Sequence, residues 1–194
     1  DDFGITQQNV RDKLDIKLDD ATAAQLATRP IQYETGFTLL PGKYVLKFLI
    51  RDAETGRMGT YQAAFTVPNL MREVTKLPTS SVVLSSQRVP LSEALLSTRA
   101  SALAVHPLVS NGQKLVPSVT RVFSRSRDLY VFLQAYERDA TATRPIAVFA
   151  SFFNESGKVF ETAPFTVTDG LQKWPNAVPV SITVPLGELA PGRY

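Results

Sequence analysis

The chain has 194 residues, of which 44% are hydrophobic and 20% charged, with a formal net charge of +3. This composition excludes an intrinsically disordered chain, and the small net charge gives no support to nucleic-acid binding. The absence of cysteine excludes a disulfide framework and a cysteine zinc site, and no apolar run reaches the roughly 18 to 20 residues of a membrane-spanning helix.

The first half of the chain contains a predicted β-hairpin. Residues 44–50 are apolar at most positions, which predicts a buried strand, and residues 60–67 predict a second strand. Residues 52–56, Asp-Ala-Glu-Thr-Gly, have the composition of a turn between them. Two segments rich in helix-forming residues, 19–28 and 92–103, are short, so we interpret both as single helical turns or loops.

The second half of the chain carries a series of shorter strand patterns. The strongest are residues 129–136 and 146–153, which are dense in β-branched and aromatic residues and are expected to be central strands. Asn111-Gly112 and Gly157 predict tight turns that require a positive φ. The other predicted strands are residues 81–84, 115–116, 118–123, 159–160, 165–167 and 178–184.

One five-residue motif occurs twice, as Leu40-Pro-Gly-Lys-Tyr44 and as Ala190-Pro-Gly-Arg-Tyr194. Pro-Gly shortly before a tyrosine is typical of a tyrosine corner, where the ring sits at the start of strand F of an immunoglobulin-like sandwich and its hydroxyl binds upstream backbone. We therefore predict structural tyrosine corners at Tyr44 and Tyr194, with the Tyr44 ring buried.

The strands placed around these two motifs predict an all-β protein made of tandem immunoglobulin/fibronectin-III-like β-sandwiches, each incomplete at a chain end. Residues 1–70 are expected to be the C-terminal part of a first sandwich, residues 71–80 a linker, and residues 81–194 a second sandwich lacking its last strands. We expect the chain to be a piece of a longer protein. Its missing strands would come from another copy of the chain or from the rest of the parent protein.

The motif-bearing segments resemble a known family. Residues 33–48, 51–61 and 65–70 are similar to the region after the von Willebrand factor A domain in the large VWFA-related proteins of Acidobacteria, and residues 81–87 and 111–123 are similar to the same proteins further downstream. These segments consist of turn residues and strand cores. The resemblance implies an exported protein at an extracellular, cell-surface or periplasmic location, and a role as a stalk or interaction module. The Asp-x-Ser-x-Ser metal motif of the A domain is absent, so the resemblance implies no metal site.

The sequence offers little for catalysis. His106 is the only histidine, it precedes Pro107, and no Gly-x-Ser-x-Gly motif occurs, so a serine triad lacks its usual parts. We therefore predict a protein that is not an enzyme and has no cofactor.

Two charged groups are interpreted as solvated turns. The oxygens of Asp52, Glu54 and Thr55 could face calcium, but one loop supplies too few carboxylates for a calcium site. The basic cluster consists of Arg121, Arg125 and Arg127, and a surface turn explains it better than a phosphate-binding track.

Aromatic residues are the candidates for a binding surface. Tyr130, Phe132 and Tyr136 alternate along one predicted strand, and Trp174 stands in a predicted loop. Exposed rings of this kind would suit a glycan, whereas burial between modules or over the end of a sandwich is the simpler interpretation. We expect a non-catalytic structural or adhesive module that binds a protein partner through β-edge or donor-strand pairing. The alternatives are a carbohydrate-binding module and, with least support, an accessory domain of an enzyme.

Overall fold

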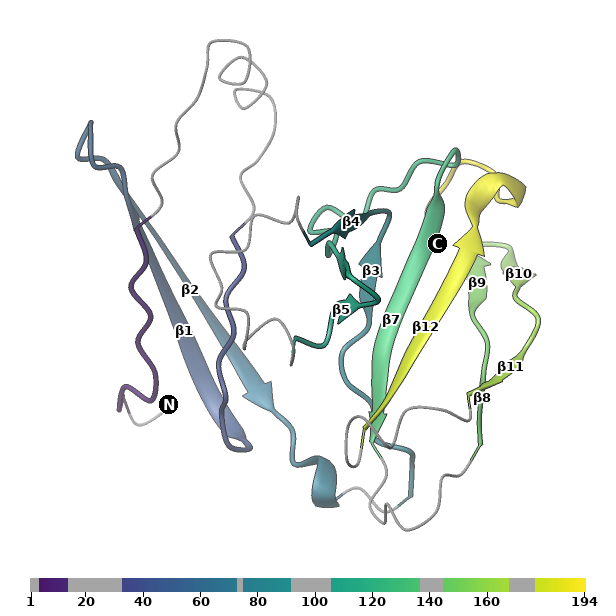
Figure 1. The fold of residues 1–194 in the computed structure, drawn as a ribbon, viewed down its shortest axis with the longest axis horizontal. Helices are drawn as coiled ribbons and strands as arrows, with labels where there is room; N and C mark the ends of the chain where they lie inside the picture. Colours follow the sequence, from purple (N-terminus) through teal and green to yellow (C-terminus); the bar gives the residue numbers. More distant parts are fainter. Residues whose placement is uncertain (1–3, 14–32, 73–74, 92–105, 137–144, 168–176) are drawn as a thin grey trace. The chain divides into compact units, whose positions relative to one another are not determined.

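The computed structural model describes residues 4–13, 33–72, 75–91, 106–136, 145–167 and 177–194. The chain divides into two compact units, Asp1–Asn69 and Leu70–Tyr194. The described residues form twelve β-strands and two 3₁₀ helices, η1 (Leu70–Arg72) and η2 (Leu186–Glu188). Figure 1 shows the path of the chain through these elements. The predicted all-β class is confirmed. The two segments with weak helical patterns, residues 19–28 and 92–103, lie outside the described residues.

The first unit contains one regular antiparallel hairpin. Strands β1 (Gly42–Arg51) and β2 (Met58–Val67) pair without a register shift over ten positions. The turn closes where the Asp52 N–H donates to the Arg57 carbonyl at 2.9 Å and the Gly56 N–H donates to the Asp52 carbonyl at 3.0 Å. Gly56 has φ of 70°, a conformation that glycine adopts without strain, so the predicted turn forms as its residues dictate.

The two faces of this hairpin differ in chemistry. Residues of β1 alternate between the faces, so that one face carries Lys43, Lys47 and Arg51. None of the described residues of the first unit is buried. The hairpin is therefore an amphipathic ribbon whose apolar face stays partly in water. That face consists of Tyr44, Leu46, Phe48 and Ile50 on β1 and of their partners Phe65, Ala63, Tyr61 and Gly59 on β2.

The second unit is built on a three-stranded sheet. Its central strand β7 (Asp128–Tyr136) pairs on one side with β12 (Ala177–Pro185) and on the other with the short β3 (Val83–Ser85). Apolar residues at alternate positions of β7 and β12 point to the same face and form the core, which confirms the prediction that β7 is central. The buried residues of this cluster are Leu129, Val131, Val180, Ile182, Val184, Leu186 and Leu189.

A second layer covers this core. It consists of β8 (Ile146–Val148), β9 (Ser151–Asn154), β10 (Gly157–Glu161) and β11 (Phe165–Val167), where β9 pairs with β10 and β8 with β11. Between the two pairs the Thr162 N–H donates to the Ala150 carbonyl at 2.9 Å, so residues 146–167 form one interrupted hairpin beside β12 (Figure 1). Its side chains that pack against the core are Val148, Ala150, Phe152, Phe160 and Val167.

The remaining strands form a small sheet in the order β4 (Arg88–Pro90), β6 (Gln113–Leu115), β5 (Val109–Ser110). Asn111 and Gly112, with φ of 51° and 72°, connect β5 to β6, and this confirms the predicted tight turn. β4 and β5 were not expected from the sequence, because strands of two or three residues have no readable periodicity.

The prediction of a strand at residues 118–123 is wrong. The Ser118 Oγ accepts a hydrogen bond from the Arg121 N–H at 3.1 Å, and Arg121 has φ of 54°. A serine side chain that binds backbone three residues ahead stabilises a turn, and a left-handed residue interrupts an extended chain. The apolar residues of this segment therefore lie in a loop, where Val119 and Val122 are exposed.

Candidate functional site

One edge of the second layer has no strand partner among the described residues. β8 and β9 bind β11 and β10 on one side, and on their other side the structure describes no strand. The N–H and the carbonyl of Ala150 both bind Thr162, so its backbone groups point to the paired side. Successive residues of a strand direct their backbone groups to opposite edges, so those of Ser151 and Phe153 point to the free edge. Residues 146–154 contain neither proline nor a charged residue. An apolar edge without these features is a template for pairing with another strand.

The free edge of β12 is blocked by proline. The Ser80 N–H donates to the Gln134 carbonyl at 2.8 Å, so Gln134 directs its backbone groups away from β12. Its partner Pro179 therefore faces the free edge of β12, as does Pro185 six residues later. Proline has no N–H to donate, and natural proteins place it on sheet edges where a further strand would be harmful.

The free edge of β10 is blunted in a different way. Its pairing with β9 shifts register between Lys158 and Phe160, which marks an irregularity that increases the local twist, and Lys158 itself is charged. Lysine and irregular twist both discourage edge pairing. The outer edge of β3 is also engaged, since the Ser118 N–H donates to the Leu84 carbonyl at 2.8 Å. Among the edges described for the two layers, the β8–β9 edge is therefore the one suited to receive a strand.

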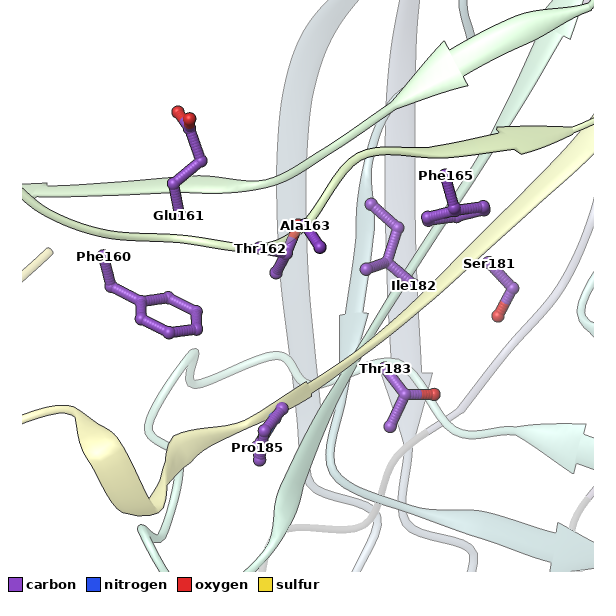
Figure 2. A pocket seen from close by; sticks show the side chains of 9 residues that line it. All are labelled: Phe160, Glu161, Thr162, Ala163, Phe165, Ser181, Ile182, Thr183 and Pro185. Atoms are coloured by element: carbon purple, nitrogen blue, oxygen red, sulfur yellow. The ribbon is translucent and has the colours of Figure 1, made fainter.

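A groove of about 600 Å³ runs between the blunted edges of β12 and β10–β11 (Figure 2). Figure 2 shows Phe160 and Glu161 pointing to opposite sides of their strand. The Glu161 carboxylate accepts hydrogen bonds from Ser151 Oγ at 2.5 Å and Lys158 Nζ at 3.2 Å. The Ser151 bond and then the Lys158 bond lower the pKa of Glu161, so at neutral pH this group is an engaged carboxylate and not a proton donor.

The two Pro-Gly motifs have the same local geometry. The Tyr44 hydroxyl donates to the Leu40 carbonyl at 2.7 Å, and the Tyr194 hydroxyl donates to the Ala190 carbonyl at 2.6 Å. In each motif the ring lies over the glycine: a Cβ at Gly42 would stand 3.4 Å from the Tyr44 ring, and a Cβ at Gly192 would stand 3.8 Å from the Tyr194 ring. The Tyr44 ring is half-buried, so the prediction that it is buried is wrong, and Tyr194 is 48% exposed. These hydroxyl bonds to the fourth residue upstream are of the type that a tyrosine corner makes.

The second motif contacts strand β9. The Tyr194 ring contacts the Phe152 ring edge to face, with 6.4 Å between centroids and an interplanar angle of 77°. Phe152 belongs to β9 and packs against the core. The Pro-Gly turn therefore brings the chain from the layer of β12 to the layer of β9.

The aromatic residues singled out from the sequence do not form an open platform. Tyr130, Phe132 and Tyr136 lie on the face of β7 opposite to the core, where all three are half-buried. The Arg88 guanidinium stands 4.1 Å from the centroid of the Tyr130 ring, which it covers. Trp174 lies outside the described residues.

A polar pocket of about 460 Å³ adjoins Tyr130. It offers guanidinium, amide and hydroxyl groups beside one aromatic ring, from Ser86, Gln87, Arg88, Gln113, Arg127 and Tyr130. The pocket combines hydrogen-bond donors with a ring, which is the chemistry of a site for a polar ligand. The sequence analysis did not find it, because Gln87, Gln113 and Arg127 are far apart in the chain and carry no shared motif.

The remaining charged candidates are engaged locally. The Asp52 carboxylate accepts hydrogen bonds from the Thr55 hydroxyl and from the Glu54 N–H, and these bonds lower the pKa of Asp52. The His106 Nδ1 accepts the Leu108 N–H at 3.2 Å, and Arg125 donates to the Gly187 carbonyl at 2.7 Å. In the part of the chain that the structure describes, no three acidic, histidine or cysteine side chains gather as a metal site would require.

Sequence patterns do not reveal the most distinctive feature, the free edge. The apolar pattern of residues 146–153 predicts a central strand, whereas in the described structure these residues form β8 and β9, which have a partner on one side only. A high density of apolar residues is the same signal for a buried central strand and for an edge that a partner covers.

Comparison with models of protein families, with curated proteins and with solved structures finds no match for this chain. Among the described residues, no helix has the length and apolar character that a membrane span needs.

Proposed function

We propose that this chain is a non-catalytic structural and adhesive module of an exported bacterial protein, and that it binds a protein partner by accepting a β-strand at the β8–β9 edge. The observation that carries the proposal is the contrast between edges. β12 presents Pro179 and Pro185 to solvent, whereas residues 146–154 present nine residues without proline or charge. The accepted strand would take the position that the predicted sandwich gives to one of its last strands.

Edge pairing is also energetically reasonable here. A strand added to β8–β9 would gain main-chain hydrogen bonds at Ser151 and Phe153, each with a net worth of about 0.5 to 1.5 kcal/mol. Every second side chain of the added strand would face the core beside Phe152 and Ala150, where burial contributes about 25 cal/mol per Å² of apolar surface. The main chain thus supplies affinity, and the alternate side chains supply specificity.

The proposed location is extracellular, at the cell surface or in the periplasm. It is supported by the similarity of residues 33–48 and 111–123 to the region downstream of the A domain in acidobacterial VWFA-related proteins. A sequence without cysteine is compatible with export, because the chain then has no thiol that an oxidising compartment could oxidise.

An array of synthetic ten-residue peptides with alternating apolar and polar residues tests the proposal. We expect the intact chain to bind peptides of this pattern, the Phe153→Ala variant to retain binding, and the Phe153→Pro variant to lose it. The two variants lose the same ring, which is 56% exposed, but only proline removes the N–H at the free edge. Thr183→Pro, at an outward position of β12, controls for proline in an edge strand and should bind as the parent chain does.

Absence of binding to every peptide, or equal binding by the Phe153→Pro variant, would refute strand acceptance at this edge. Hydrogen exchange gives a second readout, since the amides of Ser151 and Phe153 should become protected when a strand pairs with this edge.

The second candidate function is carbohydrate binding, favoured by the polar pocket beside Tyr130. A glycan array separates the two functions, because a strand-accepting module should bind no glycan. Binding of a glycan that is lost in the Tyr130→Ala and Arg88→Ala variants, but kept in Phe153→Pro, would support the carbohydrate-binding module instead.

A further inference from the structure

The repeated motif suggests which strand the free edge receives. Leu40-Pro-Gly-Lys-Tyr44 leads directly into β1, and Ala190-Pro-Gly-Arg-Tyr194 has the same hydroxyl bond and the same ring over glycine. The ring of Tyr194 contacts the ring of Phe152 in β9. Because the two motifs share their geometry, strand β1, which follows Tyr44, is the candidate donor for the β8–β9 edge.

We infer that the β8–β9 edge of one copy of this chain binds the β1–β2 hairpin of a second copy, with β1 antiparallel to β8–β9 and Tyr44 opposite Phe152. The inference rests on the proposed function and names its partner. Length agrees, since β1 has ten residues and the edge spans residues 146–154.

The chemical pattern of the two strands matches in this register. Opposite residues of paired strands share a face, so a register with Tyr44 opposite Phe152 places the apolar face of β1 over the core. A slip by one residue would instead turn Lys43 and Lys47 toward the core, which burial of charge forbids. In the inferred register Leu46, Phe48 and Ile50 of the second copy lie opposite Ala150, Val148 and Ile146.

The β1–β2 hairpin has apolar surface to bury. Leu46, Ile50, Tyr61 and Phe65 lie on its apolar face and are 37%, 57%, 64% and 41% exposed. A specific interface typically uses about 20 to 30 residues from each partner. β1 and β2 have ten residues each, and only their alternate residues would face the core, so one hairpin supplies about half of its residues to the buried face and reciprocal exchange between two copies doubles this contribution.

Light scattering of the whole chain as a function of concentration tests the inference with a matched pair of variants. Ile50 and Leu49 are neighbours in β1, 57% and 63% exposed, on opposite faces of the hairpin. The parent chain should self-associate. Ile50→Glu should weaken association more than about a hundredfold, because the carboxylate would have to enter the core, and Leu49→Glu should associate as the parent does.

Crosslinking between single-cysteine variants tests the register, because the natural chain has no cysteine. In an equimolar mixture, Lys47→Cys and Phe149→Cys face each other on the outer side, so a short thiol-to-thiol reagent should link them. Lys47→Cys mixed with Ala150→Cys is the control, since the two side chains then point to opposite faces and should not react.

The outcomes separate the inference from the proposed function. A parent chain that stays monomeric, equal effects of Ile50→Glu and Leu49→Glu, or failure of the Lys47→Cys and Phe149→Cys pair to crosslink overturns the second copy as partner. If alternating peptides nevertheless bind and Phe153→Pro abolishes that binding, the proposed function stands and the strand donor is a different protein segment. If no peptide binds and the parent chain also stays monomeric, both fall.

Discussion

The β1–β2 pair and the β7–β12 pair have similar backbones and very different burial. The first ladder joins ten pairs of residues and the second joins nine. On β12, Val178, Val180 and Val184 are at most 1% exposed, whereas no described residue of the first unit is buried. β7–β12 is covered by the hairpin at residues 146–167. Backbone pairing builds a ribbon, but only a packed second layer removes its apolar face from water.

The largest difference in stability between the two strand pairs should appear when one charged residue is introduced into each of them. We expect Val180→Asp to destabilise the second unit by more than about 4 kcal/mol, because an unpaired carboxylate would be buried. Leu49→Asp in β1, at a position 63% exposed, should change stability by less than about 0.5 kcal/mol. Urea unfolding followed by circular dichroism measures both, and a comparable loss in the two variants would contradict the comparison.

A smaller loss is expected from a buried hydroxyl that ties β3 to its neighbours. Ser85 is 0% exposed, accepts the Gln87 N–H at 3.0 Å and donates to the Val116 carbonyl at 2.5 Å. Ser85→Ala leaves those backbone groups without a partner and should cost about 1 to 3 kcal/mol. Thr183→Ala, at an exposed position of β12, is the control and should be close to neutral in the same unfolding experiment.

The tyrosine motifs allow the two units to be compared directly. Tyr44→Phe and Tyr194→Phe each remove one hydroxyl that binds a carbonyl four residues upstream. We expect Tyr44→Phe to cost about 1 kcal/mol and Tyr194→Phe to cost less, since the more exposed hydroxyl loses less when water replaces the carbonyl. Thermal unfolding of both variants checks the order, and a greater loss for Tyr194→Phe would show that exposure does not decide it.

The smallest effects concern the carboxylates of the two hairpins. Asp52 and Glu161 have lowered pKa values because of hydrogen bonds from Thr55 and Ser151, respectively. Thr55→Val should raise the pKa of Asp52 toward its usual 3.8, and Ser151→Ala should raise that of Glu161 toward 4.5. A depressed folded-state pKa stabilises the fold above the unfolded pKa, and this contribution is lost as pH falls through the folded pKa. NMR titration of the carboxyl carbons measures each shift, and an unchanged pKa would assign the shift to another cause.

Local features were predictable where a few neighbouring residues decide the conformation. The turns at Asn111-Gly112 and Gly157 have the expected positive φ, because these residues tolerate it with little strain. The strands around residues 44–50, 129–136 and 178–184 were predictable from their apolar content. Residues 118–123 show the limit of this reasoning, since a serine side chain competes with strand formation for the backbone of Arg121.

The sequence shows that residues 146–154 are apolar, but it could not predict that they form a sheet edge. Whether a proline blocks a sheet edge or interrupts a central strand depends on which strands lie beside it, and Pro179 acquired its role only because Gln134 turns its backbone groups toward Ser80. The polar pocket beside Tyr130 likewise gathers residues from three segments of the chain.

The all-β class, the turns and the alternation of apolar residues can be inferred from the amino-acid sequence, because each depends on the conformational preferences and polarity of adjacent residues. The three-dimensional fold is needed to see that residues 146–154 have no strand on one side among the described residues, that prolines block the free edge of β12, and that the Tyr194 ring contacts Phe152. Strand pairing joins residues distant in the chain, and a backbone N–H carries no side-chain signature of the partner it binds.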